Sequence, residues 1–173
     1  MKKLLLALLF CLAISDIFAQ ATGDTVSFNP VDTGWHQNSP MYVITDTAQQ
    51  IKVNATGAAP GYQSFTLRIP ILNLSKNPYV IVSMKTNSSV YVRIDLEDNN
   101  NWLTNRVQTM QLVNGNTYSN YTFDFTGSFY QKYNANNTGQ HTVDSTHIAA
   151  LVFYFNPGQN PGFTGDVYIN QVL

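Results

Sequence analysis

The sequence predicts an all-β fold, an antiparallel β-sandwich. Short runs of Val, Ile, Tyr, Phe and Thr recur along the chain and are separated by clusters of Asn, Gly, Pro and Asp. Helical periodicity is nearly absent once the N-terminal apolar run has ended. The chain also contains ten Phe, ten Tyr and two Trp, while only 11% of its residues are charged. Short strands with turn signals at this spacing are typical of a sandwich or a barrel.

The expected strands follow one another with brief breaks. They lie at residues 41–46, 50–55, 62–69, 79–85, 90–96, 106–112, 119–126, 148–155 and 164–172. Asn114-Gly115 favours a tight hairpin turn before the strand at 119–126. Successive side chains of a strand point to opposite faces, so alternating apolar residues are expected to point into the core. In the third and fourth strands these residues are Phe65, Leu67, Ile69, Val80, Val82 and Met84.

The segment 148–155 is apolar on both faces, unlike the other expected strands. This pattern predicts a central strand that is covered on both sides, or one that lines an aromatic cleft. Residues 127–146 form the longest stretch without strand periodicity. Such a stretch is compatible with a functional loop and equally with a solvent-exposed loop that has no function.

The first 21 residues are expected to form a secretory signal peptide. Lys2 and Lys3 precede an almost wholly apolar run, and small residues follow at Ala19 and Ala21, either of which suits cleavage. The apolar run is shorter than the about 20 residues that a transmembrane helix needs.

Residues 22–173 are expected to form one exported domain, extracellular or periplasmic. Cys11 lies in the signal segment, so the mature domain has no cysteine, which excludes a disulfide framework. Removing Lys2, Lys3 and Asp16 leaves seven of nine basic and nine of ten acidic residues, a net charge of −2. Without clustered Lys or Arg, neither nucleic acid nor an anionic membrane is expected as a partner.

The expected strand at 90–96 has two different faces. Its even-numbered residues are Val, Val, Ile and Leu, whereas its odd-numbered residues are Tyr91, Arg93 and Asp95. One face is therefore expected in the core and the other in water. An aromatic ring, a cation and an anion in a row suit a sugar, because rings stack on the C–H face of a pyranose and polar groups bind its hydroxyls.

The candidate ligand face extends beyond this strand. Trp102 follows it closely in the chain and adds a second aromatic ring. The alternative is a solvated face on which Arg93 and Asp95 merely pair with charged neighbours, although an exposed pair contributes little to stability. Further outward side chains would share the ligand face if their strands lie in the same sheet: Tyr62, Arg68, Tyr79 and Lys85.

Three stretches of the chain, at 79–102, 143–158 and 163–170, carry a resemblance to a known family. Their order resembles the galactose-binding-like jelly rolls found among carbohydrate-binding modules of secreted bacterial glycoside hydrolases. The resemblance implies a jelly-roll sandwich that binds a polysaccharide or oligosaccharide without cleaving it.

The resemblance also raises the question of a structural calcium ion. Such modules commonly carry an Asp in the last strand at the place of Asn170, where it helps to hold calcium. Asn offers one neutral oxygen instead of a carboxylate, so a lower calcium affinity is expected here. The resemblance implies Asp24, Asp166 and Asn170 as candidate ligands.

Catalytic signatures are missing, so an enzyme is not expected. The only Glu, Glu97, is expected in a turn, and glycoside hydrolysis usually needs two carboxyl groups facing each other across the sugar. The sequence contains no G-x-S-x-G or H-E-x-x-H motif, and its three histidines show no metal-ligand spacing. The alternative function is a structural or adhesive extracellular domain that binds protein partners without sugar specificity.

Overall fold

The computed structural model describes most of the chain after the N-terminal segment. The described residues are 35–37, 42–47, 50–57, 63–104, 109–127, 142–159 and 161–173. The expected signal peptide at 1–21 lies outside them. Within these ranges, no helix is long and apolar enough to cross a membrane.

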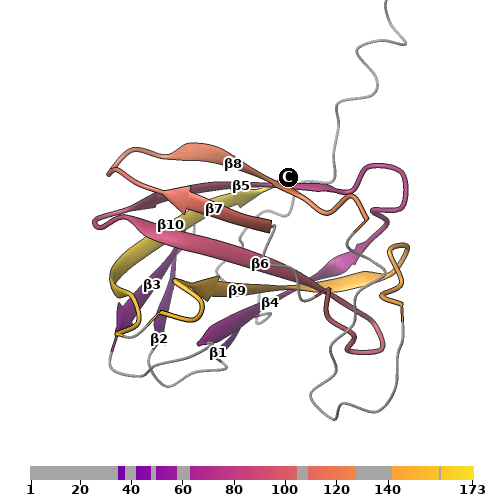
Figure 1. Cartoon of the computed structure of the whole chain (residues 1–173), viewed down its shortest axis with the longest axis horizontal. Helices are drawn as coiled ribbons and strands as arrows, with labels where there is room; N and C mark the ends of the chain where they lie inside the picture. The colour runs from indigo at the N-terminus through magenta and orange to yellow at the C-terminus, as the bar shows by residue number, and fades with distance from the viewer. Residues whose placement is uncertain are drawn as a thin grey trace, which may run out of the picture.

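Two five-stranded antiparallel sheets form a β-sandwich (Figure 1), which confirms the predicted fold class. One sheet, called the β6 sheet below, has the order β1 (Trp35–Gln37), β4 (Ser64–Leu72), β9 (Ile148–Phe155), β6 (Val90–Asp98) and β7 (Met110–Val113). The other, called the β10 sheet, has the order β2 (Tyr42–Thr47), β3 (Gln50–Thr56), β10 (Thr164–Val172), β5 (Tyr79–Thr86) and β8 (Ser119–Asp124). From β4 onward the chain crosses between the sheets at most connections.

The expected strands are present, with differences at some of their ends. β6 continues through Asp98, so Glu97 lies in a strand and not in a turn as predicted. β4 continues past Pro70, at an irregular part of its pairing with β9, where the missing proline N–H is tolerated. β1 is an addition to the expected strands. Residues 106–108 of an expected strand and residues 128–141 of the expected long loop lie outside the described ranges.

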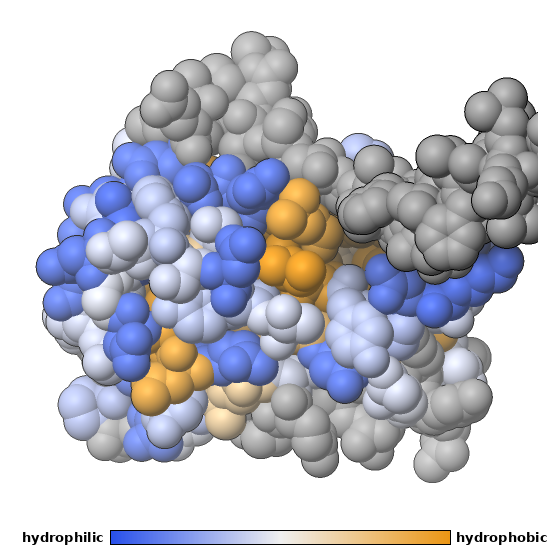
Figure 2. Space-filling model, turned by 90° about the horizontal axis from the view of Figure 1, so that it is seen from above, coloured by the Kyte–Doolittle hydropathy of each residue, from blue (hydrophilic) through white to orange (hydrophobic). Residues whose placement is uncertain are grey.

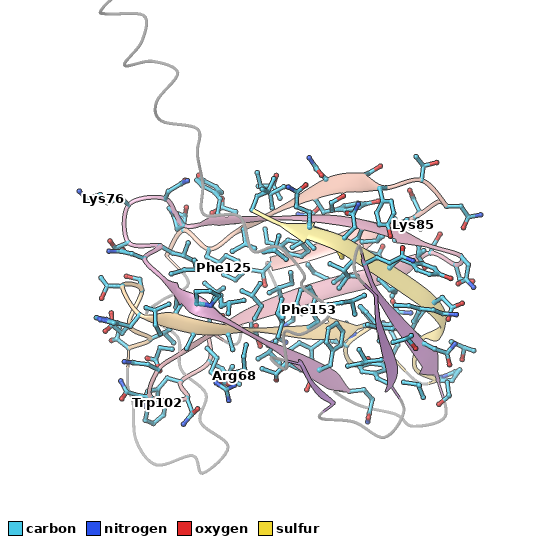
Figure 3. The ribbon with its side chains drawn as sticks, turned by 180° about the vertical axis from the view of Figure 1, so that it is seen from behind. Arg68, Lys76, Lys85, Trp102, Phe125 and Phe153 are labelled. Carbon is cyan, nitrogen blue, oxygen red and sulfur yellow. The ribbon has the colours of Figure 1, made fainter. Side chains whose placement is uncertain are left out.

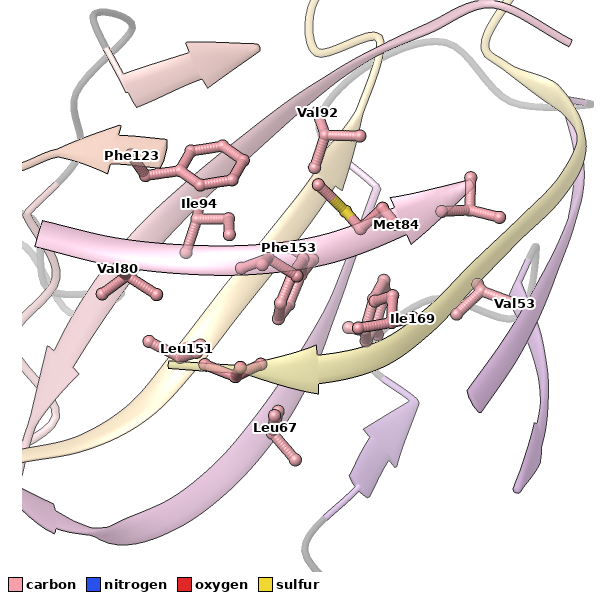
Figure 4. Packing of buried hydrophobic residues seen from close by; sticks show 14 of the residues in the cluster. Val53, Leu67, Val80, Met84, Val92, Ile94, Phe123, Leu151, Phe153 and Ile169 are labelled. Carbon is pink, nitrogen blue, oxygen red and sulfur yellow. The ribbon is translucent and has the colours of Figure 1, made fainter. Parts of the chain in front are cut away.

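The core lies between the two sheets and is built from the inward side chains of both (Figure 4). All six side chains predicted to point inward from the third and fourth expected strands are less than a tenth exposed. Phe65 of β4 and Phe153 of β9 stack with their ring centroids 4.9 Å apart and an interplanar angle of 5°. Removing such rings from water is the main source of stability in a fold without disulfides.

β9 is covered on both faces, as its sequence predicts. Its residues Leu151, Phe153 and Phe155 belong to the core cluster between the sheets. Val152 and Tyr154 point to the other side, together with Ala150, yet none of these three is more than 9% exposed. The outer face of the β6 sheet is therefore closed to water along its central strand.

Tyr42 connects the edge of the β10 sheet to β9. Its hydroxyl donates a hydrogen bond to the Gln63 carbonyl oxygen at 3.1 Å and accepts one from the Phe155 amide at 3.3 Å. Burial raises the pKa of Tyr42 to about 12, against a smaller opposing effect of the Phe155 hydrogen bond. The phenol therefore stays neutral, and keeps its proton to donate, throughout the physiological range.

A β-bulge interrupts β10 near its end. Ile169 pairs with Met84, and Gln171 pairs with the adjacent Ser83, so Asn170 is an extra residue in the ladder. Because of this extra residue, Ile169 and Val172 both point into the core, with exposures of 0% and 1%.

The surface seen from the β8 side is largely hydrophilic, with hydrophobic residues in small separate areas (Figure 2). Among the residues with described side chains, the exposed large hydrophobic ones lie on different strands and are Val43, Ile71, Tyr79, Tyr91 and Leu112. Single exposed hydrophobic side chains are normal on a soluble protein. Tyr91 and Leu112 are an exception, since they are direct cross-strand partners.

We expect Phe153→Ala to lower the free energy of unfolding by about 3–5 kcal/mol, because it removes a fully buried ring and leaves a cavity beside Phe65. Urea denaturation followed by circular dichroism measures the change. Ile71→Ala, at a side chain that is 53% exposed, is the control and should cost about 1 kcal/mol or less. Equal losses in the two variants would contradict the position of Phe153 in the core.

Candidate ligand-binding site

The outer face of the β6 sheet brings polar side chains of β4 and β6 together across β9. Residues that stand opposite each other on neighbouring strands point to the same face. Cross-strand pairing places Arg68 of β4 and Glu97 of β6 on either side of Ala150. The small Ala150 side chain leaves room for the two longer ones to meet. Further along β6, Arg93 pairs with Tyr154.

Arg93 and Asp95 form a buried ion pair, whereas the sequence predicts that both are exposed to water. Arg93 Nε and Nη2 lie 3.1 and 2.6 Å from the two carboxylate oxygens of Asp95, and the side chains are 3% and 1% exposed. The guanidinium also lies over the Tyr154 ring, 4.9 Å from its centroid. Strand alternation correctly predicts that both side chains point away from the core, but it carries no information about whether the outer face is open.

The burial of this pair favours a structural role over direct contact with a ligand. A charge removed from water is costly unless a partner and hydrogen bonds compensate it, and here the two-pronged contact of Arg93 compensates Asp95. A role of either residue in ligand binding stays a prediction.

Arg68 and Glu97 form the accessible charged pair of this face. Arg68 Nη1 lies 2.7 Å from Glu97 Oε1, and the side chains are 43% and 13% exposed. Glu97 Oε1 itself is buried, and the Arg68 guanidinium compensates its charge. The sequence identifies Arg68 but not Glu97, although extending the alternation of Tyr91, Arg93 and Asp95 by one step predicts its orientation.

Tyr91 presents its ring at the other end of β6. The side chain is 48% exposed, beside Leu112, which is 44% exposed. Asn156 fixes the Tyr91 backbone: its amide donates to the Tyr91 carbonyl, and its Oδ1 accepts from the Tyr91 amide, both at 2.8 Å. Asn156 has a φ of 45°, a left-handed conformation that Asn adopts more readily than most residues. The exposed ring is thus positioned through its backbone.

Asp98 organises the loop that carries Trp102. Its Oδ1 accepts hydrogen bonds from the amides of Asn100 at 2.8 Å and Trp102 at 3.0 Å, and its Oδ2 accepts one from the Asp144 amide at 2.9 Å. The Asp98 side chain is 1% exposed. This carboxylate ties the turn after β6 to the segment before β9, and it thereby positions the partly buried Trp102 indole.

Asp144 in turn stabilises the segment that enters β9. Its Oδ1 accepts hydrogen bonds from the Thr146 amide and hydroxyl at 2.9 and 2.6 Å, and its Oδ2 lies 2.9 Å from His147 Nδ1. The Thr146 hydrogen bonds, with a smaller contribution from His147, lower the pKa of the Asp144 carboxyl. The carboxylate therefore stays ionised at neutral pH.

Two of the predicted ligand residues lie on the opposite sheet. Tyr79 and Lys85 belong to β5 of the β10 sheet, so they do not share a face with Tyr91. Figure 3 shows Lys85 and Trp102 at opposite ends of the molecule. The sequence does not reveal this separation, because β5 and β6 follow each other in the chain but join different sheets. Tyr62 lies outside the described residues.

The candidate calcium ligands are not brought together in the described part of the chain. Asp166 and Asn170 stand four positions apart on β10, about 13 Å along an extended strand. Asp166 already receives Lys52 Nζ at 3.1 Å and a hydrogen bond from Asn54 at 2.7 Å. No group of three His, Cys, Asp or Glu side chains in the described ranges could hold a metal ion. Asp24 lies outside these ranges, so calcium binding stays a prediction.

Comparison with known proteins identifies structural relatives only. No protein-family model matches the sequence, and no characterised protein sequence is significantly similar to it. An agarase, AgWH50C, superimposes with a TM-score of 0.57 at 8% identity, over 86% of this chain and 24% of that one. CtCBM11 superimposes with a TM-score of 0.57 at 13% identity, over 88% of this chain and 95% of that one. A family 11 carbohydrate-binding module of cellulase Lic26A-Cel5E of Clostridium thermocellum gives 0.52 at 14% identity, with the same coverage of 88% and 95%.

The coverage differs between the two kinds of relative. This chain spans about a quarter of the agarase, but nearly the whole of each binding module. At such low identities the likeness establishes the fold alone. These matches therefore confirm the expected jelly-roll sandwich. They do not show what this chain binds.

Replacing Asp98 with Ala should lower the free energy of unfolding by about 3 kcal/mol, because three backbone amides lose a buried, charged acceptor. Asp124→Ala is the matched control: Asp124 accepts a hydrogen bond from the Thr126 amide but is exposed, so its loss should cost about 1 kcal/mol or less. Thermal denaturation ranks the two variants. Similar losses would argue against Asp98 as the organiser of the Trp102 loop.

Arg93→Ala should destabilise the fold by about 3–5 kcal/mol, because it leaves the Asp95 carboxylate buried without its charged partner. The double variant Arg93→Met with Asp95→Leu leaves no buried charge and should recover much of the loss. Urea denaturation measures both variants. A single variant as stable as the double one would contradict the structural role of the pair.

Proposed function

We propose that this protein is a non-catalytic module that binds a polysaccharide or oligosaccharide through the outer face of the β6 sheet. The observation that carries the proposal is the extent of the fold match, which covers 88% of this chain and 95% of a carbohydrate-binding module. A family 11 module from the same organism has been solved in complex with a β-1,3-1,4-mixed-linked tetrasaccharide. The match to about a quarter of an agarase supports a role beside enzymes that act on polysaccharides.

The outer face of the β6 sheet offers both kinds of contact that a sugar needs. The exposed Tyr91 ring provides aromatic surface for the C–H groups of pyranose rings. Trp102, in the turn after β6, is partly buried against the core cluster and adds the accessible part of its indole. Arg68, which is 43% exposed, provides hydrogen-bond donors beside the Glu97 carboxylate that it neutralises. By analogy with base stacking, each ring contributes about 1–3 kcal/mol. Binding is then expected in the roughly micromolar to millimolar range.

The carboxylates of this face do not form the arrangement that glycoside hydrolysis uses. Asp95 and Glu97 stand two positions apart on one strand, and each is paired with an arginine. Hydrolysis usually uses two carboxyl groups on opposite sides of the glycosidic bond. The geometry therefore supports binding without cleavage.

We further propose that the mature protein acts outside the cytoplasm, in the periplasm or outside the cell. The basic and then apolar start of residues 1–21 supports export. A domain without cysteine does not depend on the redox state of the compartment that it enters.

Affinity electrophoresis of the mature domain in gels that contain neutral glucan, xylan or mannan tests the proposed function. We expect at least one polymer to retard the protein. Trp102→Ala and Arg68→Ala should each weaken that binding by about tenfold, because each removes a stacking surface or a hydroxyl donor worth about 1.4 kcal/mol.

Lys76→Ala, which removes an exposed charge from the loop between β4 and β5, is the control and should bind like the wild type. Unchanged binding in folded Trp102 and Arg68 variants would place the site elsewhere. No retardation of the folded wild type by any polymer would favour the structural or adhesive function.

A further inference from the structure

We infer that the outer face of the β10 sheet carries a second binding site, which takes an acidic sugar. The site is a row of side chains, called the lysine–tyrosine row below, that consists of Lys52, Tyr168, Lys85 and Tyr118. Cross-strand pairing places Tyr168 of β10 between Lys52 of β3 and Lys85 of β5. The row lies on the sheet opposite to the proposed neutral-sugar face and does not depend on it.

Lys85 is held between two aromatic rings. Its Nζ lies 4.5 Å from the ring centroid of Tyr118 and 5.0 Å from that of Tyr168. Cation–π contacts stabilise the ammonium charge without consuming its N–H donors. Across the described ranges, no carboxylate lies within 4.0 Å of Lys85 Nζ. Its N–H groups therefore remain available to a ligand.

Both tyrosines of the row have a polar partner for the hydroxyl, which is close for Tyr118 and distant for Tyr168. The Tyr118 hydroxyl donates to Gln50 Oε1 on β3, so this side chain extends across β5 and β10. The Tyr168 hydroxyl lies 3.5 Å from Asp166 Oδ2. Burial, with a smaller contribution from Tyr168, raises the pKa of Tyr118, so the phenol keeps its proton at neutral pH. Rings that are already fixed lose little conformational entropy when a ligand stacks on them.

The charge of Lys52, at the other end of the row, is compensated. Lys52 Nζ lies 3.1 Å from Asp166 Oδ2, and Asn54 donates to Asp166 Oδ1 at 2.7 Å. Partial burial acts to raise the pKa of Asp166, but hydrogen bonds from Asn54 and Lys52 lower it overall. Among the described residues, Lys85 is therefore the cation of the row without a carboxylate partner, on a chain whose net charge is −1.

An acidic sugar matches this arrangement better than a neutral one. A carboxylate or sulfate ester accepts charge-assisted hydrogen bonds from Lys85, which are about twice as strong as neutral ones. The sugar ring can stack on Tyr168 or Tyr118 beside the ammonium group. On the β6 sheet, in contrast, Glu97 already neutralises Arg68, so that face does not select for a negative charge.

Affinity electrophoresis at low salt, in gels that contain dextran, dextran sulfate or polygalacturonate, tests the second site. We expect retardation by dextran sulfate or polygalacturonate, and stronger retardation by dextran sulfate than by dextran. Binding to dextran sulfate alone identifies a sulfate ester as the recognised group, and binding to polygalacturonate alone identifies a carboxylate. Lys85→Gln and Tyr168→Leu should each weaken the binding by about tenfold. Lys85→Arg keeps the charge and the ring contacts, so it should retain most of the affinity.

Lys76→Gln is the matched control, because it removes the same charge from an exposed lysine at the opposite end of the molecule (Figure 3). It should bind the acidic polymers like the wild type. Equal weakening in the Lys76 and Lys85 variants would indicate non-specific attraction and overturn the site. The absence of retardation of the folded wild type by both acidic polymers would also overturn it.

The two faces can be tested separately. Trp102→Ala should weaken binding to a neutral polysaccharide and leave binding to the acidic polymer unchanged. Loss of acidic binding in Trp102→Ala would overturn the second site, since both ligands would then share one face. If the folded wild-type protein binds an acidic polymer but no neutral polysaccharide, the function proposed above is wrong. The second site at the lysine–tyrosine row is then still supported.

Discussion

The burial of β9 on both faces is the constraint on which the β6 sheet depends. A central strand that is covered on both sides is almost wholly apolar, so β9 offers few polar partners to its neighbours apart from Tyr154, whose ring lies against Arg93. Polar side chains of β4 and β6 must then find partners across it or within their own strand. Arg68 reaches Glu97 across the small Ala150, whereas Arg93 and Asp95 pair with each other on β6. The same strand thus yields one accessible pair and one buried pair.

The sequence predicts the strands and their inward faces well, because a period of two in hydrophobicity follows directly from strand geometry. The same period cannot predict whether the outward face is exposed to water. Arg93 and Asp95 are therefore correctly predicted to point outward but wrongly predicted to be exposed. The period also cannot predict which strands share a sheet, so Lys85 is separated from Trp102. The contact between Asp98 and Asp144, which are 46 residues apart, depends on the complete fold and has no local sequence signal.

The aromatic rings of the candidate site are positioned by contacts to their backbones. Asn156 binds both backbone polar groups of Tyr91, and Asp98 binds the amide of Trp102. The supporting residues therefore fix the location of a side chain without fixing its type. A change of ring at position 91 or 102 alters the surface that a ligand meets, while the hydrogen bonds that place it remain.

The bulge in β10 gives the last strand an unusual tolerance to a change in its length. In a regular strand, the loss of one residue turns every following side chain to the other face. Asn170 is one residue more than the pairing with β5 requires, so its deletion would restore regular alternation and keep Ile169 and Val172 toward the core. It would also remove an amide oxygen that is buried without a hydrogen-bond partner in the described structure. Position 170 is therefore a point at which a single-residue deletion, usually confined to loops, can be accommodated inside a strand.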